Sequence, residues 1–97
     1  MTVKELRERL MTFTDEERGK HVMALMKLLS PVSLQSIRKV QDEWDWDNNP
    51  PPEGPIKFFK KQNEVIIECL RMEQSDIGIM VRGQLGLSPL KDEEELE

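Results

Sequence analysis

The sequence has few of the residues that build active sites. Its 97 residues include one cysteine, Cys69, one histidine, His21, and no tyrosine. A nucleophilic Cys–His pair needs a third group that orients the imidazole ring, and nothing beside either residue suggests one. A zinc site needs about four cysteine, histidine or carboxylate ligands, and the chain has too few of the first two. We therefore expect a protein that is not an enzyme and that holds neither a metal ion nor another cofactor.

Long apolar runs and phosphate-binding loops are missing as well. No stretch approaches the ~18 uninterrupted apolar residues of a membrane span, and the N-terminus lacks the apolar region of a signal peptide. Gly78, Gly83 and Gly86 do not have the spacing of nucleotide-binding fingerprints. A lone cysteine cannot form an internal disulfide bond. These features favour a cytoplasmic protein with no membrane segment.

The charge is distributed unevenly along the chain. The net charge is −5, and five of the 19 acidic residues lie in residues 92–97, so the rest of the chain balances 14 basic with 14 acidic side chains. Proteins that bind nucleic acids usually carry a concentrated basic face. This chain offers only Lys57, Lys60 and Lys61 as a local basic cluster. We expect one domain over residues 1–90, followed by a disordered acidic tail over 91–97.

Apolar residues recur at helical spacing near the N-terminus. Residues 2–5 have the threonine and glutamate of a capping box, in which two side chains satisfy the free amides at a helix start. We expect a first helix over residues 3–12 after this signal. Residues 14–17 repeat the capping box and predict a second helix over residues 15–29. The wide apolar arc of this second helix indicates that most of it is buried.

A third helix is expected to begin at Ser30 and Pro31, because serine is favoured at the N-cap and proline at the first helical position. It should end near Trp46, so that residues 3–47 hold three helices. The proline-rich residues 48–55 follow. Proline lacks an amide donor and disfavours a helical conformation in the residue before it, so this segment predicts an elbow between two halves of the chain.

The second half, residues 56–87, is predicted to be helical too, although strands are an open alternative. Residues 56–72 carry a long, regular apolar stripe at helical spacing. Residues 77–87 predict a short, imperfect helix, because its three glycines each cost ~1 kcal/mol in a helix interior. We therefore expect an all-α bundle of four to five helices. The alternative is an α+β fold in which residues 56–82 form two or three strands.

The two tryptophans stand among acidic residues, in the sequence Glu43, Trp44, Asp45, Trp46, Asp47. On a helix the two indoles would point about 200° apart, whereas in an extended segment they would share a face. We assign Trp44 to the core of the third helix. Trp46 either packs beneath the prolines or belongs to an exposed acidic–aromatic patch that binds a basic partner groove, as tryptophan is enriched at binding hot spots.

Three functions are consistent with these features. The first is a protein-interaction module, a small regulatory or adaptor protein that binds another protein or a second copy of itself, through the five residues of the acidic–aromatic segment. The second is a transcriptional regulator that binds nucleic acid through Lys57, Lys60, Lys61 and Arg82, although the balanced charge argues against nucleic acid. The third is a structural component of a phage or secretion assembly.

Overall fold

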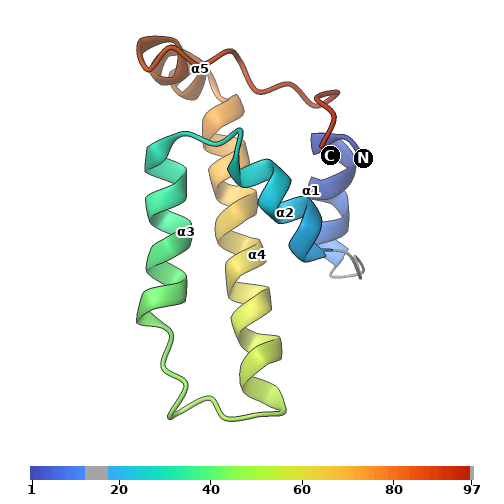
Figure 1. Ribbon diagram of the computed structural model, residues 1–97, viewed down its shortest axis with the longest axis vertical. Coiled ribbons are helices and arrows are strands. Elements are labelled where there is room, and N and C mark those ends of the chain that lie inside the picture. Colours follow the sequence, from blue (N-terminus) through green and yellow to red (C-terminus); the bar gives the residue numbers. More distant parts are fainter. Residues whose placement is uncertain (13–17, 97) are drawn as a thin grey trace.

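The computed structural model describes residues 1–12 and 18–96, and these residues form five α-helices (Figure 1). The helices are α1 (Val3–Thr12), α2 (Arg18–Met26), α3 (Pro31–Glu43), α4 (Glu53–Gln74) and α5 (Asp76–Gln84). The all-α prediction is confirmed. The α+β alternative is wrong, because residues 56–82 lie almost entirely in α4 and α5.

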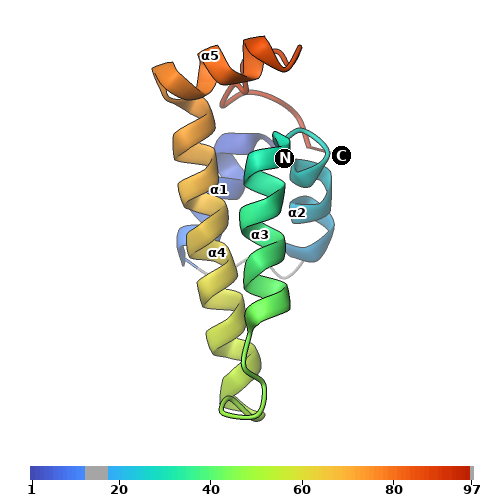
Figure 2. The ribbon, with the colours of Figure 1, turned by 90° about the vertical axis from the view of Figure 1, so that its left-hand side faces the viewer.

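The longest helix, the 22-residue α4, is the centre of the molecule. It packs against α1, α3 and α5, and α3 lies beside it in the opposite direction (Figures 1 and 2). Figure 2 shows α5 lying across one end of the α3–α4 pair, while the connection between α3 and α4 forms the other end. The molecule is elongated, with dimensions of 41 × 25 × 19 Å.

The apolar core lies in the half of the molecule nearer α5. There α1 and α2 cover the α3–α4 pair, and the C-terminal segment closes the remaining side (Figure 1). The buried apolar side chains are Val3, Leu6, Leu10, Val22, Leu25, Leu29, Ile37, Ile66, Cys69, Leu70, Leu90 and Leu96. On α4 these residues begin only at Ile66. The first three turns of α4 therefore extend beyond the core together with the end of α3.

Local signals account for most of the helix starts. The capping box of α1 is formed: the Thr2 hydroxyl accepts from the Glu5 amide at 3.2 Å, and the Glu5 carboxylate accepts from the Thr2 amide at 3.4 Å. The Thr2 hydroxyl and the Thr2 amide both donate to the Glu5 carboxylate, and these two hydrogen bonds lower the pKa of Glu5. The capping box expected for the second helix lies outside the described residues. That helix ends at Met26 rather than Leu29, because the chain turns there and the Leu28 and Leu29 amides both donate to the carbonyl of Leu25.

The connection between α3 and α4, residues 44–52, begins and ends earlier in the chain than the predicted elbow over residues 48–55. Helix α3 ends at Glu43 instead of near Trp46, and α4 begins at Glu53, inside the predicted elbow. Pro55 fits the first turn of α4, where its missing amide would have no intrahelical partner. Gly54 is buried because the chain passes so close that an added Cβ atom would lie 1.6 Å from the Asn49 carbonyl oxygen.

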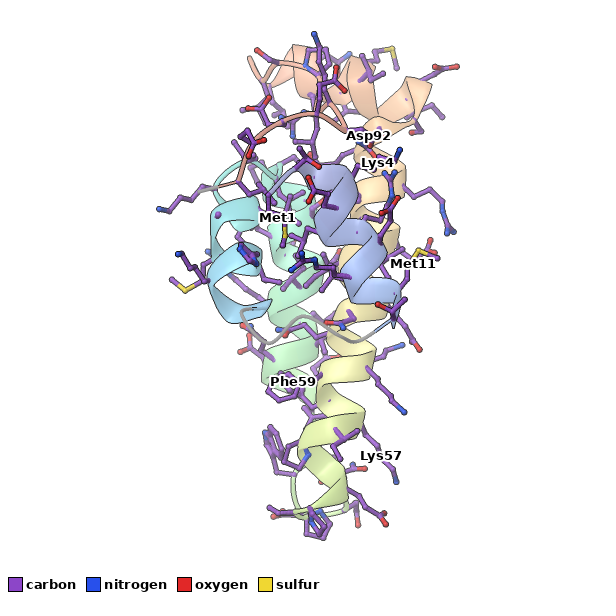
Figure 3. The ribbon with its side chains drawn as sticks, turned by 90° about the vertical axis from the view of Figure 1, so that its right-hand side faces the viewer. Met1, Lys4, Met11, Lys57, Phe59 and Asp92 are labelled. Atoms are coloured by element: carbon purple, nitrogen blue, oxygen red, sulfur yellow. The ribbon has the colours of Figure 1, made fainter. Side chains whose placement is uncertain are left out.

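The C-terminal segment differs from the disordered tail that its charge predicted. It lies along α1, where the Val3 amide donates to the Glu94 carbonyl and the Lys4 amide to the Asp92 carbonyl, both at 3.0 Å. Figure 3 shows Asp92 beside Lys4. Leu96 is buried in the core. The first amides of a helix have no intrahelical acceptor, so the segment supplies acceptors that α1 needs.

Candidate functional site

Four aromatic rings gather at the end of the α3–α4 pair that lies beyond the core. Phe58, from the second turn of α4, is the central ring: its centroid lies 5.6 Å from Trp44, 5.3 Å from Trp46 and 5.6 Å from Phe59. The two indoles are 6.3 Å apart and meet edge to face. Ring centroids 4.5–7 Å apart in tilted arrangements are favourable. We call Trp44, Trp46, Phe58 and Phe59 the aromatic tip.

The two tryptophans share this cluster because the helix ends before them. Trp44 is extended, with φ −67° and ψ 127°, and residues two apart in an extended segment point to the same side. The separation of about 200° predicted for a helix is therefore wrong, and the extended alternative holds. Trp44 is half-buried within the aromatic tip, and Trp46 stays 47 % exposed against Phe58.

Asp45 holds the turn that positions the indoles on either side of it. Its carboxylate accepts from the Asn48 amide at 3.2 Å and contacts the Asn48 side-chain amide, and its carbonyl accepts from the Asn49 side chain at 2.8 Å. The hydrogen bonds from Asn48 lower the pKa of Asp45. Asp45 is thus occupied by its own turn, whereas Glu43 and Asp47 are exposed beside the rings.

A shallow groove runs from the aromatic tip along the α3–α4 seam. Its first part, about 410 Å³, lies between α3 and α4 and is lined by Ser36, Lys39, Val40, Glu43, Trp44, Lys61 and Val65. It shares three of these residues, Ser36, Lys61 and Val65, with a larger hollow of about 880 Å³ that extends to Met11 and Met72. The floor is apolar and the rim carries charges of both signs. This surface is suited to an elongated apolar segment of a partner.

The indole N–H of Trp44 is buried and has no hydrogen-bond acceptor within the part of the chain that the structure describes. An indole N–H can only donate, and it usually finds an acceptor when it is buried. Leaving such a donor unpaired costs about 1–3 kcal/mol.

The basic residues of the nucleic-acid hypothesis do not come together. Lys57, Lys60 and Lys61 are exposed on the first half of α4, where Figure 3 shows Lys57 and Phe59 far from Met1 and Asp92. Arg82 lies at the opposite end of the molecule and is 5 % exposed. Its assignment as a phosphate contact is wrong, because its guanidinium group already donates to a carboxylate and two carbonyls.

Those acceptors belong to a buried network that the sequence did not reveal. The Arg82 guanidinium donates to the Glu73 carboxylate at 2.5 Å and to the carbonyls of Leu28 and Ser88, each at 2.8 Å. Both carboxylate oxygens of Glu73 also accept from the Ser30 amide, at 3.0 and 3.2 Å. The network ties the α2–α3 corner, α4, α5 and the C-terminal segment together. Since its charges are paired and buried, it is part of the scaffold.

The two residues considered for catalysis lie in a structural setting. Cys69 is buried in α4, and its thiol lies 3.8 Å from the Ser33 carbonyl. Burial raises the pKa of the Cys69 thiol, which is opposite to the change that a nucleophilic thiolate needs. His21 lies on α2 and is half-buried. No group of three or more histidine, cysteine or acidic residues within the described ranges could hold a metal ion.

Comparisons with known protein families, characterised proteins and solved structures find no match for this chain. Among the described residues, no helix combines the length and the apolar content needed to cross a membrane. The chain's own residues therefore carry the functional argument.

Proposed function

We propose that this chain is a non-enzymatic, cytoplasmic protein-binding module, a small adaptor or regulatory protein that contacts its partner through the aromatic tip. One observation carries the proposal: Trp46 is 47 % exposed within a cluster of four rings that lies outside the core. Tryptophan is among the residues that contribute most to binding energy at protein interfaces. Contiguous exposed apolar surface on a small domain commonly marks such an interface.

The charges around the tip indicate what kind of partner fits. Exposed carboxylates of Glu43 and Asp47 flank the tryptophans along the chain, whereas exposed lysines, Lys57 and Lys60, flank the phenylalanines. A partner pocket with an apolar floor and basic groups where it meets the tryptophans complements this arrangement. An arginine of the partner could also stack on the exposed face of Trp46, since guanidinium groups favour aromatic faces. The apolar groove that continues from Trp44 would take an adjoining segment of the same partner.

The proposal is tested by titrating the chain with a synthetic peptide of alternating leucine and arginine, monitored by tryptophan emission and calorimetry. Binding should weaken at least tenfold in Trp46→Ala and remain unchanged in Met23→Ala, which alters a 66 % exposed side chain on α2. Proteins that crosslink to the wild type and to Met23→Ala, but not to Trp46→Ala, identify natural partners. Equal binding by both variants would contradict the proposal. The proposal would also be contradicted if the chain bound a single-stranded oligonucleotide in a salt-dependent manner, and if neither the peptide nor the Trp46→Ala substitution changed that binding.

A further inference from the structure

Helix α5 is packed with its apolar side chains outward. Its buried residues are Gly78 and Arg82, whereas Ile77 is 69 % exposed, Met80 58 % and Ile79 40 %. A surface helix normally buries an apolar stripe and exposes polar residues. A nine-residue helix that contains two glycines has little stability of its own, so its position depends on packing. The outward face of α5 therefore has the apolar composition that is typical of a surface buried in a contact.

The contacts within the chain explain the inward side of α5 and leave the outward side unused. At Gly78 an added Cβ atom would lie 1.9 Å from the Met72 carbonyl oxygen, so glycine lets α5 cross closely over the end of α4. Arg82 enters the buried network with Glu73. By contrast, a Cβ atom added at Gly83 would have no neighbour within 4 Å. The surface around Gly83, Met80 and Ile77 is open.

The helix α5 carries one exposed charge, Asp76 at its first residue, in a chain of which 34 % of the residues are charged. Across residues 77–90 the only ionisable side chain is Arg82, and it is buried and paired. In a two-fold contact centred on the middle of α5, a charge at the axis would meet its like, whereas Asp76 at one end of the helix would face the other end of the partner helix, where Gln84 is uncharged. Two copies with a net charge of −5 each repel one another over most of their surface. Apart from Asp76, the outward face of α5 is a place where they can meet with little of that repulsion.

We propose that the outward face of α5 binds a second copy of this chain and forms a two-fold symmetric dimer centred on Met80. Met80 is the middle residue of Asp76–Gln84, so a two-fold axis at the centre of the contact brings it opposite Met80 of the other copy. The surface is distinct from the aromatic tip, which lies at the other end of α4. The dimer therefore neither requires the proposed partner nor competes with it.

The size of the face sets the strength of this dimer. A helix of nine residues is about 13.5 Å long, and its apolar side offers a few hundred Å² per copy. Stable interfaces bury about 800 Å² per partner. The dimer should accordingly form in a concentration-dependent manner and dissociate on dilution.

Sedimentation velocity from about 10 µM to about 1 mM tests the proposal on the wild type, Met80→Glu and Met80→Lys. The wild-type sedimentation coefficient should rise with concentration. Each variant alone should stay monomeric, because like charges then meet at the axis, while an equimolar mixture of the two should associate again. Met23→Glu, at a comparably exposed methionine of α2, should behave as the wild type. Because Met80 is exposed, the variants should keep the wild-type urea midpoint.

Several results would overturn the proposal: a wild type that remains monomeric at about 1 mM, association that persists in Met80→Glu, or a mixture that does not associate. A monomeric wild type that sediments with phosphatidylcholine vesicles, with loss of this binding in Met80→Glu, would assign the face to a lipid surface instead. Trp46→Ala should leave self-association unchanged. A failure of the aromatic-tip proposal is thus distinguishable from a failure of this one.

Discussion

Replacing Arg82 by methionine should cause a large loss of stability. The substitution keeps most of the aliphatic volume but removes the guanidinium group, which donates to Glu73, Leu28 and Ser88. Glu73 is only 2 % exposed, so its carboxylate would keep a single partner, the Ser30 amide. Removing one member of a buried ion pair typically costs about 3–5 kcal/mol, because the other charge is left without compensation.

That cost is a large part of the total for a domain of this size, whose free energy of unfolding is typically about 5–15 kcal/mol. With a denaturant slope of about 2 kcal/mol per molar urea, the midpoint of Arg82→Met should fall by about 2 M. Urea unfolding followed by far-ultraviolet circular dichroism measures this shift. Tryptophan emission gives a second probe, because both indoles lie at the far end of α4.

A double variant separates the ion pair from the backbone contacts. Glu73→Leu combined with Arg82→Met removes the stranded charge, so it should be more stable than Arg82→Met alone. It should not reach the wild type, because Ser30, Leu28 and Ser88 each lose a hydrogen-bond partner. If Arg82→Met lowered the free energy of unfolding by less than about 1 kcal/mol, the value of an exposed pair, the buried network would be refuted as a determinant of stability.

Other parts of the fold give predictions of different sign. Gly83→Ala should raise the free energy of unfolding by ~1 kcal/mol through helix propensity, whereas Gly78→Ala should lower it because its methyl group would collide with the end of α4; urea unfolding measures both changes. Hydrogen bonds from Arg7 hold the pKa of Asp92 below its ordinary value of 3.8. The stability that they contribute should therefore be present above pH 3.8 and be lost as the pH falls through the lower pKa of the folded state. An NMR titration of the Asp92 carboxyl in the wild type and in Arg7→Gln measures this lowering of the pKa. Cys69 should react with a thiol reagent only as fast as the protein opens, since its thiol is buried and its pKa is raised; a rate that fails to increase in mild urea would contradict this.

The starts of α1 and α3 were predictable from the sequence, whereas the end of α3 and the start of α4 were not. The starts depend on residues next to one another, such as the capping box of α1 and the Ser30–Pro31 pair. The end of α3 at Glu43 depends on a competition between two backbone structures. The Asp45 carboxylate accepts from the Asn48 amide and so stabilises a turn in place of a further turn of helix. The position of the C-terminal segment depends on α1, which lies some ninety residues earlier, and no local pattern encodes such a contact.

The candidate site was likewise predictable in part. The tryptophans were identified from their surroundings, but Phe58 was not, because its place between them depends on how α3 and α4 lie against each other. Arg82 looked like a surface cation until its partner Glu73, on a different helix, was known. The outward face of α5 was not predictable either, since the sequence of an apolar helix does not show which of its sides packs against the rest of the chain. Sequence reasoning identified the residue types, and tertiary packing decided their roles.

A single uninterrupted helix joins the two proposed contact surfaces. At 1.5 Å per residue, the 16 residues that follow Phe58 in α4 keep the aromatic tip about 24 Å from α5. A dimer joined through α5 would hold its two aromatic tips at a fixed separation. A partner with two binding sites at that spacing would gain avidity, because the second site binds from a high effective concentration. A partner with one site would gain none, so the length of α4 would itself select which assemblies this protein recognises.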